Sequence, residues 1–416
     1  MCKFHWAQGV APFSLLALCA LSAMAACGGS PAVAAAPSPA AAVSAPSLTV
    51  SSAQRPAEDS RIPQGLRGQV DTYLAASGLV KGPHVTELTI DPAISAWADE
   101  AVTRAVQDPQ VREALTVVVD PRTGEVLALR GRRHGQQDDA WDLGVRGEYT
   151  PASVTKTFTL AAALDAGVVR ADQRFSGDNG KSLIDGQILT DASPHGDMST
   201  TDMMVFSSNI VAGKIALALG KERLGEAFGR FHFGEVPRIE LQGAAAGKLK
   251  PFSSLTKFQT AVLGAGHYYV LSPLQVAMGF ASVVNDGVYN RPTLVRRVKD
   301  DAGRTVYESK PEPQRILRHE TSETEMRMLR AAVDRDDAHG KTARVPGCQV
   351  AGKTGSGEAE EGWGYVTFAG TFPAEKPRVV IVTGVVARED AGYSGPKTAA
   401  PMFREIAQKI IAATGC

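Results

Sequence analysis

A serine and a lysine three residues apart, Ser153 and Lys156, have the side chains needed for a nucleophile and a base in acyl transfer. Residues three apart on a helix share a face, so the neutral amine of Lys156 can take the proton of the Ser153 hydroxyl. Two further Ser-x-x-Lys matches begin at Ser254 and Ser394. Pro396 lies inside the second of them and opposes a helix there. Because the pattern is loose, the surrounding sequence has to decide between the candidates.

Two later motifs follow Ser153 in the order that an active-site serine acyltransferase requires. The first is a Ser-x-Asn motif from Ser207 to Asn209, and the second is a Lys-Thr-Gly-Ser motif that starts at Lys353. No Ser-x-Asn motif follows Ser254 in the same way. Each motif is weak alone, and their order together favours Ser153 as the nucleophile.

The sequence around Ser153 predicts a helix that begins at this serine. Pro151 lies just before it, residues 153–165 favour a helix, and Gly167 follows. Proline at the entry and glycine at the exit are typical of a helix. Ser153 would then lie where backbone N–H groups are unpaired and the helix dipole favours negative charge. The alternative interpretation is a serine that only caps the helix, with a solvated Lys156.

Several segments resemble the transpeptidase domain of penicillin-binding proteins, most closely the class B type. The segments that contain the three motifs are 149–156, 194–196 with 207–209, and 351–356. The others are 88–92, 117–128, 272–275, 285–287 and 399–403, in the family's order. The resemblance covers roughly residues 85 to 416.

Hydrophobic periodicity predicts an α+β fold. The expected strands and the terminal helix are 115–119, 125–129, 349–354, 365–372, 378–386 and, for the helix, 398–413. A mostly helical insertion from about 150 to 340 would bring in the first two motifs. The resemblance implies the same plan, a penicillin-binding and serine β-lactamase-like fold with a five-stranded antiparallel sheet and flanking helices.

The resemblance also implies roles for the motif residues. Ser153 would attack the carbonyl of a D-alanyl-D-alanine peptide bond, with Lys156 as its general base. A lysine needs a lowered pKa to work at neutral pH, so Lys156 should be desolvated and close to another cation, for which Lys353 is the candidate. Ser207 would relay a proton to the leaving amine, and Asn209 would bind the substrate backbone.

The Lys353 motif is expected to bind the rest of the substrate. Gly355 has no side chain and would let the substrate lie along the strand edge. The hydroxyls of Thr354 and Ser356, with Lys353, suit a terminal carboxylate. Family geometry would place the oxyanion between the backbone N–H groups of Ser153 and Ser356. A β-lactam mimics the substrate and would trap Ser153.

Composition and the N-terminal sequence indicate an exported protein. Lys+Arg and Asp+Glu number 44 each, so no strong field attracts nucleic acid. Residues 1–27 read as a lipoprotein-type signal peptide with lipidation at Cys27, although ordinary cleavage or retention of the segment as an anchor stays open. Lipidation would place the protein in the cell envelope, anchored in a membrane and facing the periplasm or exterior.

The expected organisation after the leader has three parts. Residues 28–58 form an Ala/Pro/Ser-rich linker, 59–110 a short N-terminal helical region, and 111–416 the transpeptidase domain. Within 59–110, helices are expected over 61–76 and 92–106. This region is too short for the large pedestal module of class B enzymes, which puts a place in the division or elongation complex in doubt.

Three rivals are weighed against this hypothesis. Residues 347–354 match the phosphate-loop pattern, but polar residues precede them and Gly355 cannot open a helix. A serine β-lactamase would need a deacylation segment, yet Ile239-Glu240-Leu241 lies where penicillin-binding proteins have a similar element. A catalytically silent β-lactam sensor would need a signalling segment.

Some properties stay open at this level. Cross-linking and trimming by a D,D-carboxypeptidase share the acyl-enzyme, so the motifs do not separate them. A disulfide between Cys348 and Cys416 is geometrically allowed, and two unpaired thiols are the alternative. The expected partners are peptidoglycan stem peptides, β-lactams and a wall-building glycosyltransferase, with no cofactor and no metal.

Overall fold

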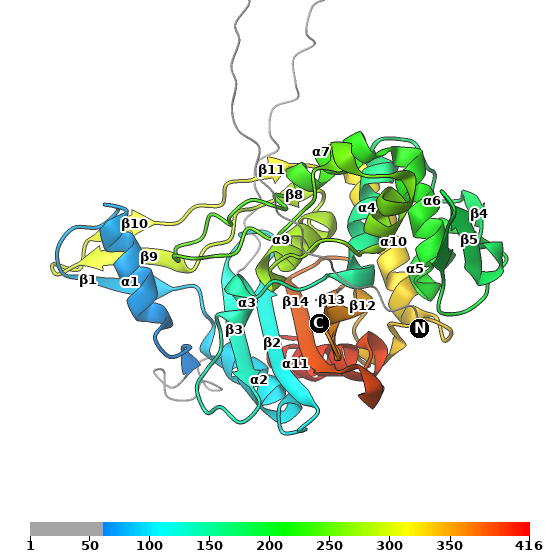
Figure 1. Cartoon of the computed structure of the whole chain (residues 1–416). Helices are drawn as coiled ribbons and strands as arrows, with labels where there is room; N and C mark the ends of the chain where they lie inside the picture. The colour runs from blue at the N-terminus through cyan, green and yellow to red at the C-terminus, as the bar shows by residue number, and fades with distance from the viewer. Residues whose placement is uncertain (1–60) are drawn as a thin grey trace, which may run out of the picture. The chain divides into compact units, whose positions relative to one another are not determined.

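The computed structural model describes residues 61–416 (Figure 1). The expected leader, Cys27 and the linker lie outside the described residues. A five-stranded antiparallel sheet of order β12-β13-β14-β2-β3 forms the centre of this part. Its strands are β2 (Val111–Val119), β3 (Val126–Arg133), β12 (Ala351–Glu360), β13 (Trp363–Phe372) and β14 (Val379–Arg388). All five predicted strands and the α+β class are therefore confirmed.

Helices cover the sheet and build most of the segment between β3 and β12. They are α1 (Leu66–Ala76), α2 (Pro92–Ala105), α3 (Leu143–Arg146), α4 (Thr155–Asp165), α5 (Thr200–Phe206), α6 (Asn209–Leu219), α7 (Lys221–Arg230), α8 (Lys257–Ala265), α9 (Pro273–Val284), α10 (His319–Asp334) and α11 (Ala400–Thr414). Local signals explain several starts. Asp91 caps α2 through its carboxylate, and Ser272 and Gln275 form a reciprocal capping box at α9. Proline is the first residue of both helices.

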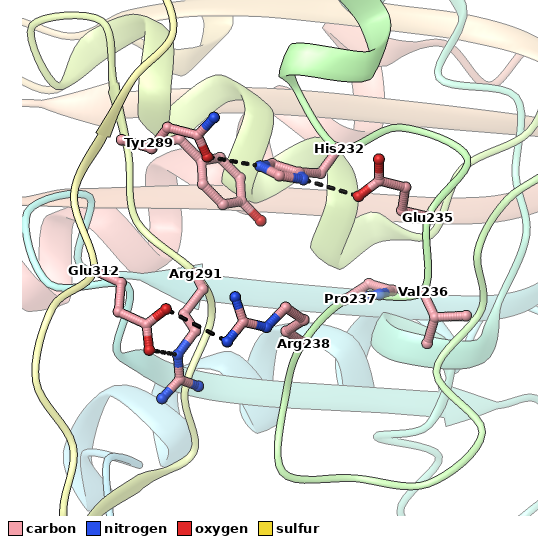
Figure 2. A pocket seen from close by; sticks show the side chains of 9 residues that line it. His232, Glu235, Val236, Pro237, Arg238, Tyr289, Arg291 and Glu312 are labelled. Carbon is pink, nitrogen blue, oxygen red and sulfur yellow. Dashed lines mark hydrogen bonds and ion pairs between the residues drawn. The ribbon is translucent and has the colours of Figure 1, made fainter.

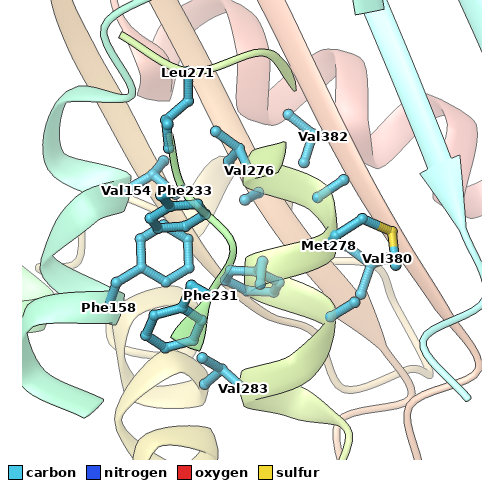
Figure 3. Packing of buried hydrophobic residues seen from close by; sticks show 14 of the residues in the cluster. Val154, Phe158, Phe231, Phe233, Leu271, Val276, Met278, Val283, Val380 and Val382 are labelled. Carbon is cyan, nitrogen blue, oxygen red and sulfur yellow. The ribbon is translucent and has the colours of Figure 1, made fainter. Parts of the chain in front are cut away.

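The sheet is buried on both faces because its strands alternate between two apolar clusters. Val379 and Ile381 of β14 belong to the cluster that includes α2 and α11. Val380 and Val382 belong to the cluster that includes α9. Figure 3 shows how Phe158 of α4 continues this second cluster from the sheet into the helices. The helix α4, which follows Ser153, is thereby fixed against the sheet.

The remaining strands are short. They are β1 (His84–Leu88), β4 (Arg174–Ser176), β5 (Lys181–Ile184), β6 (Gln187–Thr190), β7 (Asp197–Ser199), β8 (Val288–Tyr289), β9 (Val295–Asp300), β10 (Thr305–Glu308) and β11 (Gln314–Arg315). The expectation of a mostly helical insertion missed eight of these strands, β4 to β11. β9 pairs with β1 and β10 in a separate three-stranded sheet, and Leu66 and Val70 of α1 share a buried cluster with Val295 and Val298 of β9.

A disulfide joins Cys348, just before β12, to Cys416 at the end of α11. The two Cα atoms lie 5.6 Å apart, within the range that disulfides require. The structure thus contains the disulfide rather than two unpaired thiols. The bridge connects the start of the Lys353 strand to the helix that covers the sheet.

No helix among residues 61–416 is both long enough and apolar enough to cross a membrane.

Candidate active site

Ser153 lies on a 3-10 turn, η3 (Ala152–Val154), directly before α4. The preceding residue, Ala152, has a left-handed φ of 51°, which is uncommon for a residue other than glycine. A Cβ at position 266 would lie 1.9 Å from the Ala152 carbonyl oxygen, so only Gly266 fits behind this turn. The prediction that α4 begins at Ser153 is corrected to a start two residues later, because residues 152–154 form a 3-10 turn that leads into the α-helix. Within the described chain the Ser153 N–H donates no backbone hydrogen bond.

Lys156 lies at the centre of the cluster and has no exposed surface. Its Nζ lies 2.6 Å from Ser153 Oγ, 2.8 Å from the Ser207 carbonyl oxygen, 3.2 Å from Ser207 Oγ and 2.7 Å from Asn209 Oδ1. Burial lowers the pKa of Lys156 well below that of a free lysine, and the charge of Lys353 lowers it further. The expected neutral amine beside the serine hydroxyl is therefore physically reasonable.

Ser207 reaches the cluster because the chain breaks between α5 and α6. It adopts a left-handed conformation with φ 59° at the end of α5. Ser208 then caps α6 by accepting from the Val211 N–H at 3.1 Å. The break turns both the carbonyl and the hydroxyl of Ser207 toward Lys156.

Lys353 approaches the same hydroxyl from β12. Its Nζ donates to Ser207 Oγ at 2.9 Å and to the Thr354 carbonyl at 3.2 Å. Ser207 Oγ therefore lies between the two lysines. Lys353 is 1% exposed, and burial lowers its pKa to about 7. Burial thus lowers the pKa of both lysines, which favours the neutral form of each amine relative to a free lysine.

β12 is an edge strand of the sheet, and the rest of its motif lines that edge. Thr354 is buried, whereas Ser356 is exposed and its Oγ accepts from the Gly395 N–H at 3.0 Å. A Cβ at Gly355 would lie 2.7 Å from the Pro151 carbonyl oxygen. Glycine is therefore needed here for close packing of the strand against the nucleophile turn, a reason that the sequence interpretation did not include.

Sequence reasoning missed three ionisable residues around the cluster. Asp191, after β6, binds the start of α6 and opposes the lowering of the Lys156 pKa. Burial and the charge of Lys156 lower the pKa of His267 to about 4, and burial with both lysines does the same for His339. No local motif marks these residues, because each reaches the site from a segment remote from the three motifs.

The competing Ser-x-x-Lys matches do not form comparable pairs. Ser254 Oγ donates to the Pro251 carbonyl at 2.7 Å. Within residues 61–416, neither Lys257 nor Lys397 has a side-chain hydrogen bond to the serine three residues earlier, whereas Lys156 does. The structure thus brings Ser153, but neither competitor, into contact with its lysine.

The phosphate-loop alternative is contradicted by the local structure. Its lysine and threonine lie on β12, and the chain continues as a strand to Glu360 rather than opening a helix. The 239–241 segment, whose resemblance to a penicillin-binding-protein element opposes the β-lactamase alternative, contacts residues 291–294. Glu240 is buried, accepts from the Leu294 N–H at 2.8 Å and pairs with Arg291 at 3.2 Å.

Figure 2 shows a separate pocket to whose lining Arg291 belongs. Its lining residues are His232, Glu235, Val236, Pro237, Arg238, Tyr289, Arg291, Glu312 and Gln314. None of the three motifs contributes to it, so the pocket is distinct from the Ser153 cluster.

Comparison with known proteins agrees with this geometry. Residues 114–408 match the family described as "Penicillin binding protein transpeptidase domain". Penicillin-binding protein PbpB of Mycolicibacterium smegmatis is 31% identical over 78% of this chain and 54% of its own length. The probable peptidoglycan D,D-transpeptidase PbpC of Pseudomonas aeruginosa is 26% identical over 82% of this chain and 61% of its own. The chain thus spans about half to three fifths of the length of these two relatives.

Solved structures show the same relationship. Penicillin binding protein 3 of Mycobacterium tuberculosis in complex with aztreonam superposes with a TM-score of 0.72 at 28% identity, covering 79% of both chains. The transpeptidase domain of Burkholderia pseudomallei penicillin-binding protein 3 gives 0.69 at 26% identity, covering 78% of this chain and 96% of that domain. The fold, the order of the motifs and the matched residues lead to one conclusion: this chain belongs to the penicillin-binding protein transpeptidase family.

Proposed function

We propose that this chain is a serine D,D-transpeptidase that cross-links peptidoglycan stem peptides through an acyl-enzyme and is acylated by β-lactams. The observation that carries the proposal is the 2.6 Å contact between Lys156 Nζ and Ser153 Oγ. A neutral amine has two protons and one lone pair. Its protons are taken by two oxygens, the Ser207 carbonyl and Asn209 Oδ1, which leaves the lone pair for the Ser153 hydroxyl.

Acylation would proceed as follows. Lys156 takes the hydroxyl proton while Ser153 Oγ bonds to the carbonyl carbon of the penultimate D-alanine. The backbone N–H groups of Ser153 and Ser356 bind the developing oxyanion. The proton then passes from Lys156 through Ser207 to the nitrogen of the terminal D-alanine as the C–N bond breaks. The products are a Ser153 ester and free D-alanine.

Substrate binding would use the edge of β12. Lys353 and the hydroxyls of Thr354 and Ser356 are suited to the terminal carboxylate. The Ser356 hydroxyl accepts a hydrogen bond from Gly395, so its own proton remains available to an anion. Asn209 Nδ2 donates one proton to the Thr190 carbonyl at 2.9 Å and keeps a second for the substrate backbone.

The acceptor decides between cross-linking and trimming. An amine from a second stem peptide gives a transpeptidase product, and water gives a carboxypeptidase product. Transpeptidation is proposed because PbpC and the FtsI protein of Escherichia coli are both named peptidoglycan D,D-transpeptidases. β-Lactamase activity is disfavoured because the contacts of Glu240 are with the 291–294 segment.

The test is to incubate the purified protein with fluorescent penicillin and with a stem-peptide substrate, and to identify the products by mass spectrometry. The adduct should map to Ser153 and disappear in Ser153→Ala. The matched controls Ser254→Ala and Ser394→Ala remove the competing serines and should retain the adduct. An adduct at either of those residues, or one that persists in Ser153→Ala, contradicts the assignment.

We further propose that lipid attached to Cys27 anchors the protein in the cell envelope and that a wall-building glycosyltransferase is its partner. The support is the leader-like composition of residues 1–27 and the wall-synthesis names of the relatives. Cys27→Ala should move the protein from the membrane fraction to the soluble fraction. Unchanged fractionation and an unchanged N-terminal mass contradict lipidation.

A further inference from the structure

The carboxylate of Asp191 binds the segment that carries the second motif. Its Oδ2 accepts from Ser208 Oγ at 2.6 Å. Its Oδ1 accepts from the backbone N–H of Asn209 at 2.5 Å and from that of Ile210 at 3.0 Å. One side chain thus satisfies three donors at the start of α6, where backbone N–H groups have no partner inside the helix.

These contacts fix the two oxygens that face the catalytic amine. Asn209 is held at its backbone by Asp191 and at its Nδ2 by the carbonyl of the neighbouring Thr190. Its Oδ1 is thereby aimed at Lys156 Nζ, 2.7 Å away. The Ser207 carbonyl, which precedes the anchored Ser208, receives the other contact at 2.8 Å. If either oxygen turned away, the lone pair of the amine would lose its orientation toward Ser153.

Asp191 also brings a negative charge to the surroundings of Lys156. Lys156 is faced by Lys353 from β12, by His267 from the segment after α8, and by His339 from the segment after α10. Burial and Lys353 lower the pKa of Lys156, and Asp191 is the group that raises it. The carboxylate of Asp191 therefore opposes the lowering of the Lys156 pKa by burial and by Lys353.

We propose that Asp191 is a positioning residue for the acylation reaction, holding Ser208 and Asn209 so that Lys156 is oriented toward Ser153 and offsetting the positive charge of Lys353 beside that amine. The inference rests on the proposed acyltransferase function. Asp191 acts through other residues and does not touch the reacting atoms.

The decisive variant is Asp191→Asn, because asparagine caps a helix about as well as aspartate but has no charge. Without the carboxylate, the pKa of Lys156 falls further, and the neutral base is available at lower pH. The acid limb of the rate of acylation by fluorescent penicillin should therefore move down by about one pH unit. The maximal rate should fall about tenfold, because the amide cannot accept from all three donors in the same geometry.

Two more variants separate charge from position. Asp191→Glu keeps the charge on a longer side chain, so the acid limb should stay close to that of the wild type while the maximal rate falls. Asp178→Asn is the matched control. Asp178 also contacts α6, but through Lys214 at 2.8 Å, so both the limb and the rate should remain unchanged.

A purely structural cap predicts a different result. If Asp191→Asn keeps the wild-type acid limb and a rate within about twofold, the positioning role is wrong. The same limb shift in Asp178→Asn would also overturn it, because the effect would then not be specific to this carboxylate. Mapping the adduct to Ser153 in every variant distinguishes failure of this inference from failure of the proposed function, which would show as an adduct elsewhere.

Discussion

The apolar layer of α2 and α11 on one face of the sheet and the Ser153 cluster beside β12 are built on opposite principles. The layer joins α2 and α11 to the strands with apolar side chains, of which Phe403 is fully buried. The Ser153 cluster buries two lysines and holds Ala152 and Ser207 in left-handed conformations. Buried lysine side chains and unusual backbone conformations oppose folding, so they persist only where the surroundings enforce them. The layer should therefore determine stability, and the Ser153 cluster should determine reactivity.

The largest difference between the effect on acylation and the effect on stability is expected for substitution of Lys156. In Lys156→Met the rate of acylation of Ser153 should fall by about 100- to 10,000-fold, because a positioned base is lost. The free energy of unfolding should change by only about 1 kcal/mol, since the loss of hydrogen bonds is offset by the end of lysine burial. Stopped-flow acylation and denaturant unfolding measure the two effects. Lys156→Arg, which keeps the positive charge but does not deprotonate, should lose activity similarly, and near-normal acylation would place the base elsewhere.

The reverse effect is expected in the layer. Phe403 packs against Phe368 and Phe372, with ring centroids 4.8 and 6.2 Å away. Phe403→Ala should lower the free energy of unfolding by about 3–5 kcal/mol through cavity formation. The acylation rate of the folded fraction should stay close to that of the wild type. If the acylation rate of folded Phe403→Ala falls as far as that of Lys156→Met, the two regions are not separable.

The disulfide connects the two regions, because Cys348 lies just before β12 and Cys416 lies at the end of α11. It closes a loop with a sequence separation of 68 residues, and removing it should cost about 2–4 kcal/mol of stability. Cys348→Ser with Cys416→Ser should therefore unfold at lower denaturant concentration and still acylate. Thiol counting on denatured, unreduced protein checks the bond itself, since both cysteines should be unreactive. Labelling of both would show that they are not bonded.

The smallest expected effect is a pH dependence from Lys353. Because its pKa lies at about 7, its positive charge is present below that pH and is lost above it. The second-order rate of acylation by a carboxylate-bearing β-lactam should fall about fivefold over the first pH unit above this pKa. Lys353→Arg keeps the charge, so its rate, although lower, should lack this alkaline limb. The same limb in that variant would assign the titration to another group.

The layer was also the easier region to predict. The central strands β2, β13 and β14 follow from local runs of apolar residues, which are visible in sequence because both faces of these strands are buried. The short strand β9 was missed, because its pairing with β1 depends on a contact between residues more than 200 positions apart.

For the Ser153 cluster, the motif residues were predicted, but the residues that position them were not. Ser153, Lys156 and Lys353 are marked by spacing, and the structure brings them together with Ser207. The exact start of α4 was missed because residues 152–154 form a 3-10 turn, and their residue types do not distinguish that turn from the first turn of an α-helix. Asp191 was missed because its carboxylate reaches the motif through the β5–β6 hairpin and not through a fixed spacing.

The absence of a side chain at Gly266 has a consequence for inheritance. Any other residue would force its Cβ onto the Ala152 carbonyl and displace the turn that presents the nucleophile. An allele altered only at this codon would keep all three motifs intact and still encode an enzyme that fails to react with penicillin. Inspection of the motifs would classify such an allele as functional, whereas a genetic screen for inactive alleles should recover it.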